Sequence, residues 1–253
     1  PILRHPTHQT FHKKTLSKEQ MAAGSTRFYR WHIDAALYDA QPPIVTTLLG
    51  IKNSRGGHQT IVYDDGSGDK VDAALGATAF VSGAAALRAL PEDLRSLALN
   101  SSVTYAPHPY VYIADAKAHS TGLVCVSDGL EKPLEQLPPW EESKLVTLPL
   151  VWTNPITGEK SLQIHGACVW KLHTKAHPYG AARVMDDLAE VRSTVYSLMR
   201  PGIDPSLVYC HHWEDGDLAI FYNRGVWHSV IGQDLGSRLM HQVCVFLLWK
   251  TIC

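Results

Sequence analysis

The chain has 253 residues, of which 45% are hydrophobic and 19% are charged, and its formal net charge is -1. This near-neutral balance argues against a nucleic-acid partner, and no run reaches the roughly 18 apolar residues of a membrane span. The five cysteines are widely spaced without a CxxC pair, which favours free thiols and a cytoplasmic location over a disulfide framework.

The length is sufficient for one sizeable core, so we expect a single domain over residues 1–253. It begins with a polar, basic and His-rich segment, residues 1–26, which shows no signal-peptide or lipidation pattern. We expect a solvated lead-in. The alternative is a flap over a functional site, in which a residue such as Lys13 or Lys14 contacts substrate.

An aromatic-rich stretch after this segment contains the triplet His32-Ile33-Asp34. In a strand, residues i and i+2 point to the same face, so His32 and Asp34 would project together. The triplet alone is weak evidence for a metal site. With a distant histidine on another strand it would supply two imidazoles and one carboxylate, the facial triad of non-haem Fe(II) oxygenases.

The middle of the chain alternates between β-rich and helical patterns. The acidic loop 64–69 is interpreted as a turn, because it lacks the final glutamate of an EF-hand loop. Residues 100–147 look irregular and loop-rich. The expected strands are 44–49, 59–63 and a hairpin over 148–163; the expected helices lie within 73–99 and over 181–199.

The stretch 213–242 carries the third candidate ligand. Residues 218–222 are apolar throughout, which suits a strand buried on both faces. His228 stands just beyond this strand, and Arg238 opens the next apolar run. The two side chains could face one cavity that holds a metal-bound acid. The imidazole would bind the metal, and the guanidinium fork would pair with the far carboxylate of the acid. The alternative is a hairpin with a surface histidine and a salt-bridged arginine.

Motifs distributed along the chain resemble the taurine/2,4-D dioxygenase (TauD/TfdA) family of Fe(II)- and 2-oxoglutarate-dependent enzymes. They are WHID at 31–34, GGHQT at 56–60, PLVWTNPITGEKSL at 149–162, and GDLAIFYNRGVWH with SRLMHQ between 216 and 242. The resemblance covers residues 27–243. It implies a mainly β fold with flanking helices, the double-stranded β-helix or jelly roll.

The resemblance also implies the site and its chemistry. Its metal ligands would be His32, Asp34 and His228, holding Fe(II), while Thr60 and Arg238 would bind the cosubstrate 2-oxoglutarate. With O2, the implied reaction is oxidative decarboxylation of 2-oxoglutarate to succinate, coupled to hydroxylation of a small-molecule substrate.

The substrate is indicated by Gln242, which stands where acid-using members carry an anion-binding arginine. A neutral amide binds an anion poorly but offers a donor/acceptor pair to the edge of a heterocycle. With the stretches FYRWHIDAALYDAQPP and YDDGSGD, Gln242 makes the chain most similar to the fungal xanthine dioxygenase branch. That likeness implies hydroxylation of xanthine to uric acid, and the alternative is another heterocycle or natural product.

The chain departs from the family pattern in two respects. Tyr222 replaces the family's aspartate, and most of the N-terminal region that usually supplies core strands and part of the pocket is missing before Pro1. Folding and activity depend on whether that region is truly absent. The rival functions are a non-catalytic jelly-roll binding module and a zinc hydrolase, which would leave Arg238 without a role.

Overall fold

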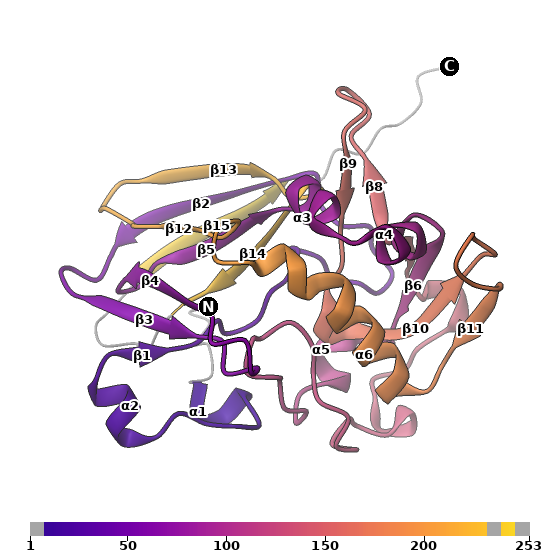
Figure 1. Ribbon diagram of the computed structural model, residues 1–253, viewed down its shortest axis with the longest axis horizontal. Helices are drawn as coiled ribbons and strands as arrows, with labels where there is room; N and C mark the ends of the chain where they lie inside the picture. The colour runs from indigo at the N-terminus through magenta and orange to yellow at the C-terminus, as the bar shows by residue number, and fades with distance from the viewer. Residues whose placement is uncertain (1–7, 232–238, 246–253) are drawn as a thin grey trace.

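The computed structural model describes residues 8–231 and 239–245, and its body contains two three-stranded antiparallel sheets that face each other (Figure 1). The first sheet has the order β13-β2-β15 and the second has the order β12-β5-β14. The strands are β2 (Val45–Lys52), β5 (Thr78–Ser82), β12 (Tyr209–His211), β13 (Leu218–Tyr222), β14 (Val226–Val230) and β15 (Leu239–Val245).

Aromatic side chains fill the space between the two sheets. The Phe221 ring on β13 lies 5.4 Å from the Phe80 ring on β5 and 5.1 Å from the His228 ring on β14. The sequence of β2 explains its place, because Thr46 and Leu48 are buried while the alternate residues Val45, Thr47 and Leu49 are half-buried. β-branched and leucine side chains at alternate positions suit such a surface. The mainly β architecture predicted from the resemblance is confirmed.

The segment before β2 extends the second sheet by running antiparallel to β14. Isolated bridges pair Phe28 with Ile231 and His32 with His228. The His32 amide donates to the His228 carbonyl at 2.9 Å, and the His228 amide donates back at 3.0 Å. This register places the HxD triplet directly beside the distal histidine.

Smaller sheets and helices lie below and to the right of this body in the view of Figure 1. The remaining sheets are β1-β3-β4, β11-β10-β6-β7 and the hairpin β8-β9. Their strands are β1 (Ser25–Thr26), β3 (His58–Val62), β4 (Lys70–Ala74), β6 (Ser101–Tyr105), β7 (Thr147–Pro149), β8 (Val151–Thr153), β9 (Lys160–Leu162), β10 (Val169–Thr174) and β11 (Arg183–Met185). The helices are α1 (His8–Phe11), α2 (Lys18–Ala22), α3 (Gly83–Ala89), α4 (Glu92–Leu99), α5 (Pro109–Tyr112) and α6 (Leu188–Met199).

The longest helix, α6, begins where the Asp187 carboxylate accepts a hydrogen bond from the Glu190 amide at 2.8 Å. Its apolar stripe of Val191, Val195 and Leu198 is buried in the core. The same core contains Trp227, whose indole N–H donates to the Leu162 carbonyl at 2.7 Å. The shared core therefore joins α6 and the small sheets to the strand that carries His228.

Several secondary-structure predictions need correction. Residues 73–82 are the end of β4, a turn and β5 rather than helix, because Ala73, Ala77 and Ala79 pack in the core, where a small side chain fits regardless of its helix propensity. The predicted helix 181–199 begins only at Leu188, after β11. The strand 218–222 is not buried on both faces. Leu218 and Ile220 are 57% and 65% exposed on the side turned away from Phe80.

The N-terminal part, residues 8–26, packs against the body. Phe11 is buried, and its ring lies 4.5 Å from that of Tyr29. Lys13 and Lys14 form ion pairs with Asp128 at 2.6 Å and Asp64 at 2.8 Å. These contacts engage both lysines that the flap interpretation assigned to substrate.

Candidate metal centre

Three side chains, the metal-site trio, converge at the junction of the HxD segment and β14. The trio consists of His32, Asp34 and His228, and one ligand atom from each lies within 4.8 Å of the others. The Asp34 Oδ1 atom is 3.6 Å from Nε2 of His228 and 3.9 Å from Nε2 of His32. The side chains are 19%, 10% and 5% exposed for His32, Asp34 and His228 respectively. The predicted ligands are therefore neighbours, although His228 is distant from the other two in sequence.

The orientation of His32 is set by the backbone just before it. Its Nδ1 atom lies 2.9 Å from the carbonyl of Arg30, which can only accept a hydrogen bond. Nδ1 must therefore carry the proton, and the lone pair of His32 lies on Nε2, facing Asp34 and His228.

Asp34 is held through both its backbone and its carboxylate. The buried Asn223 amide forms a clamp: its Oδ1 accepts from the Asp34 N–H at 2.9 Å, and its Nδ2 donates to the Asp34 carbonyl at 2.9 Å. Thr46 on β2 donates to Asp34 Oδ2 at 2.7 Å. With Oδ2 occupied in this way, Oδ1 is directed at the two histidines.

The environment keeps both imidazoles neutral. Burial, followed by the nearby His228 and His165, lowers the pKa of His32 well below its ordinary value. Burial also lowers the pKa of His228, against the opposing effect of the Asp34 carboxylate. A neutral imidazole offers a lone pair, which is the form that binds a metal.

The donor set of the trio fits a divalent transition metal. Separations of 3.6 and 3.9 Å exceed hydrogen-bond length, so the carboxylate and the imidazoles do not satisfy one another. An ion at bonds of about 2.1 Å fits between atoms spaced in this way. Two nitrogens and one oxygen on one side leave further coordination positions open, which is the facial arrangement of non-haem Fe(II) oxygenases.

A polar cluster adjoins the trio. The His165 ring lies 6.0 Å from the His32 ring, and its Nε2 is 3.3 Å from the hydroxyl of Tyr110 on α5. The guanidinium of Arg30 lies 5.1 Å from the Tyr110 ring centroid. Burial and the Arg30 charge lower the pKa of His165 to about 3, so its imidazole is neutral.

The other predicted site residues are placed less centrally. Thr60 on β3 donates its hydroxyl to Asp72 at 2.8 Å, and no hydrogen bond among the described residues joins it to the trio. Gln242 is exposed on β15, and its Nε2 lies 3.7 Å from Cys244 Sγ. Because Thr46 contacts the same sulfur at 3.8 Å, Gln242 shares a sheet face with the residue that holds Asp34. Arg238 lies outside the described residues.

Three further histidines lie near the trio's residues or Arg238 in sequence, and the cysteines were expected to be free thiols. His212 and His241 are exposed, and His211 contacts Asp217 at 3.3 Å, so none of them joins the trio. The described cysteines are free thiols: Cys125, Cys168, Cys210 and Cys244.

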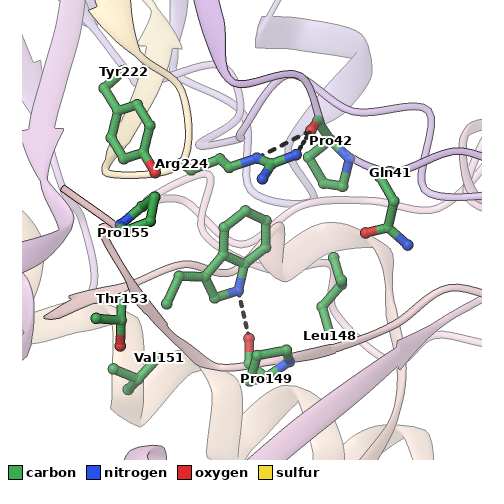
Figure 2. A pocket seen from close by; sticks show the side chains of 10 residues that line it. Gln41, Pro42, Leu148, Pro149, Val151, Thr153, Pro155, Tyr222 and Arg224 are labelled. Atoms are coloured by element: carbon green, nitrogen blue, oxygen red, sulfur yellow. Dashed lines mark hydrogen bonds between the residues drawn. The ribbon is translucent and has the colours of Figure 1, made fainter. Parts of the chain in front are cut away.

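A separate pocket of about 510 Å³ borders the β8–β9 hairpin, as Figure 2 shows. In it, Arg224 donates to the Pro42 carbonyl at 2.8 Å (Figure 2). Trp152 donates to the Pro149 carbonyl at 2.6 Å. None of the trio lines it. Its relation to the metal centre is indirect, since Arg224 follows the Asn223 that clamps Asp34.

The sequence patterns give no role to Thr46, His165, Tyr110 or Arg30, and they do not link Asn223 to Asp34. Arg30 has a readable signal, because it stands two residues before His32 in an extended segment. Thr46 and His165 carry no such signal, since their positions follow from long-range pairing.

Comparison with known proteins agrees with this geometry. The model of the family described as taurine catabolism dioxygenase TauD, TfdA family matches residues 1–244. The chain belongs to the TauD/TfdA family. This TauD/TfdA chain is 52% identical over 230 residues to an alpha-ketoglutarate-dependent xanthine dioxygenase, xanA, of Emericella nidulans, covering 91% of the chain and 60% of that protein.

Other relatives show the same pattern of coverage. An alpha-ketoglutarate-dependent xanthine dioxygenase, xan1, of Schizosaccharomyces pombe is 48% identical, with 95% of this chain and 58% of that protein covered. The alpha-ketoglutarate-dependent dioxygenase bsc9 of Alternaria brassicicola is 33% identical, with 92% and 59% covered. The chain thus spans about three-fifths of the length of the curated relatives it matches.

Solved structures support the jelly-roll fold. A putative alpha-ketoglutarate dependent 2,4-D dioxygenase from Burkholderia xenovorans superposes with a TM-score of 0.54 at 21% identity, covering 93% of this chain and 73% of that one. AAD-2, solved with Mn(II) and N-oxalylglycine, superposes with a TM-score of 0.53 at 19% identity, covering 93% of this chain and 80% of that one.

Among the described residues, no helix is both long and apolar enough to cross a bilayer.

Proposed function

We propose that the full-length protein is an Fe(II)- and 2-oxoglutarate-dependent dioxygenase that hydroxylates xanthine to uric acid. The convergence of His32, Asp34 and His228 on one point carries the metal-dependent part of this proposal. The relatives that act on xanthine, at 48% and 52% identity, support the substrate. Free thiols at Cys125 and Cys168 suit a reducing, cytoplasmic setting.

In this mechanism the trio would hold Fe(II). When bound, the iron would supply the redox chemistry that couples decarboxylation of 2-oxoglutarate, with O2, to hydroxylation of the substrate. The chain's own contribution is to fix the ligand atoms. Thr46 and Asn223 orient the Asp34 carboxylate, and the Arg30 carbonyl fixes the tautomer of His32.

Cosubstrate binding is assigned to Arg238 and Thr60 on the family resemblance. Arg238 would pair its guanidinium with the distal carboxylate of 2-oxoglutarate. Thr60 would have to exchange its hydrogen bond to Asp72 for one to the cosubstrate, because a hydroxyl has a single proton to donate.

Substrate recognition is assigned in part to Gln242. Its exposed amide lies on the sheet face that also carries Thr46, which supports this assignment. We expect Gln242→Ala to raise the KM for xanthine far more than the KM for 2-oxoglutarate. Equal increases in both constants would remove Gln242 from substrate recognition.

The experiment that tests the function measures succinate and uric acid together. The full-length protein is incubated with Fe(II), ascorbate, 2-oxoglutarate and xanthine, and His228→Ala is the control without a complete trio. Equal amounts of succinate and uric acid, both lost in the control, are expected. If succinate forms without xanthine and no uric acid appears, the substrate would be another heterocycle. If no succinate forms, the dioxygenase assignment would be contradicted.

A further inference from the structure

We propose that Arg30, Tyr110 and His165 form a substrate-binding subsite beside the metal-site trio. It would recognise an amide edge of a heterocycle, meaning a carbonyl oxygen next to a ring N–H. This inference rests on the proposed function, since it assigns part of that enzyme's substrate specificity to residues outside the metal ligands.

Arg30 is fixed beside the trio by its backbone. Its N–H donates to Ser229 Oγ at 3.3 Å, next to His228, and its carbonyl accepts from His32 Nδ1 at 2.9 Å. In an extended segment Arg30, His32 and Asp34 occupy positions i, i+2 and i+4, which share a face. The guanidinium therefore belongs to the same side of the segment as the candidate metal ligands.

The Arg30 cation is held by aromatic rings and has no carboxylate partner among the described residues. Its guanidinium carbon lies 5.1 Å from the ring centroid of Tyr110, 5.6 Å from that of Tyr29 and 5.9 Å from that of Phe11. Ring faces attract the charge but leave the N–H donors unsatisfied. Its Nε is buried without a hydrogen-bond partner. A buried donor in this state costs free energy until an acceptor arrives.

His165 supplies the complementary acceptor. The Tyr110 hydroxyl has one proton, and the Ala35 carbonyl at 3.0 Å can only accept it. The contact of 3.3 Å between Tyr110 and His165 therefore requires His165 Nε2 to donate. The lone pair of the neutral ring is then on Nδ1, which is buried and has no hydrogen-bond partner.

The two residues that carry these unsatisfied groups both contact Tyr110, and the groups have opposite character. A carboxylate would satisfy the Arg30 donor but would leave the His165 lone pair unpaired. A carbonyl beside a ring N–H would satisfy both, and xanthine carries such edges. The geometry thus favours a neutral or singly charged oxo-heterocycle over an aliphatic acid at this position.

The test uses the full-length enzyme with the substitutions Arg30→Met and Tyr110→Phe. Arg30→Met keeps the length of the stem but removes the donors, so the KM for xanthine should rise about tenfold or more. Tyr110→Phe frees the His165 ring to change tautomer, and the KM for xanthine should rise about threefold or more. The KM for 2-oxoglutarate should change far less than the KM for xanthine in both variants.

Arg88→Met is the matched control, because Arg88 is 67% exposed and pairs with Glu159 far from the trio in sequence. Binding is read independently by titrating xanthine into the anaerobic complex with Fe(II) and 2-oxoglutarate and following its visible absorption. If Arg30→Met does not fold, Tyr110→Phe decides the outcome.

An unchanged xanthine KM in the folded variants, or an equal rise in the KM for 2-oxoglutarate, would overturn the subsite. Those results would leave the proposed function intact, because wild type would still form uric acid. A wild-type enzyme that forms no succinate would instead refute the proposed function and the subsite with it.

Discussion

At the scale of single residues, the metal-site trio depends on side chains that do not themselves face the ion. Asp34 is the clearest case, because Asn223 binds its backbone on both sides and Thr46 binds one carboxylate oxygen. Such outer contacts fix the direction of a ligand and thereby tune metal affinity. The trio is therefore better described as three ligands plus their supports.

We expect Asn223→Ala to weaken Fe(II) binding by about 10- to 100-fold, because Asp34 would lose the clamp on its backbone. Asn53→Ala is the matched control, since Asn53 is also buried and donates to a backbone carbonyl, that of Glu214. Metal affinity is measured by anaerobic titration. Equal losses of affinity in the two variants would show that the effect is general destabilisation rather than ligand orientation.

At the scale of elements, the sequence predicted the parts with local signals. The HxD triplet, the β8–β9 hairpin around its Asn-Pro turn and the strands β2 and β3 are all where their patterns indicated. The alanine-rich stretch 73–82 was assigned to helix because propensity cannot register that β5 is enclosed by β12 and β14. Thr46 and Asn223 were not linked to Asp34 for the same reason, since only long-range pairing brings them together.

Two ion pairs at helix α6 test how burial changes the effect of losing an ion-pair partner on the free energy of unfolding. Arg192 is 3% exposed and pairs with Glu131 at 2.6 Å, whereas Arg183 is 53% exposed and pairs with Glu190. Arg192→Met leaves a buried carboxylate unpaired and should cost about 3–5 kcal/mol of unfolding free energy. Arg183→Met should cost less than about 1 kcal/mol. Urea denaturation measures both, and similar losses would contradict this account of α6.

At the scale of the whole molecule, buried histidines make stability depend on pH. His165 has a pKa of about 3 in the folded state, against an ordinary value of 6.5. The unfolded chain therefore binds more protons between these values, and stability falls as the pH drops below 6.5. One such group lowers the unfolding free energy by at most about 1.4 kcal/mol per pH unit.

The unfolding free energy of the metal-free wild type should decrease as the pH falls from 6.5, the ordinary histidine pKa, to 5. We expect a smaller decrease over this range in His165→Gln. The same substitution at exposed His212 should leave the slope as it is in wild type. Denaturant unfolding at several pH values provides the measurement. A His165→Gln protein with the wild-type slope would show that this ring does not stay neutral in the folded state.

The central claim is that His32, Asp34 and His228 bind Fe(II) and leave positions open for 2-oxoglutarate. The most direct measurement is the visible spectrum of the full-length protein with both added under anaerobic conditions. The account predicts a weak charge-transfer band that saturates at one iron per chain and is lost in Asp34→Ala. A wild-type protein that binds Fe(II) and 2-oxoglutarate without such a band, or an Asp34→Ala variant that retains it, would contradict the account.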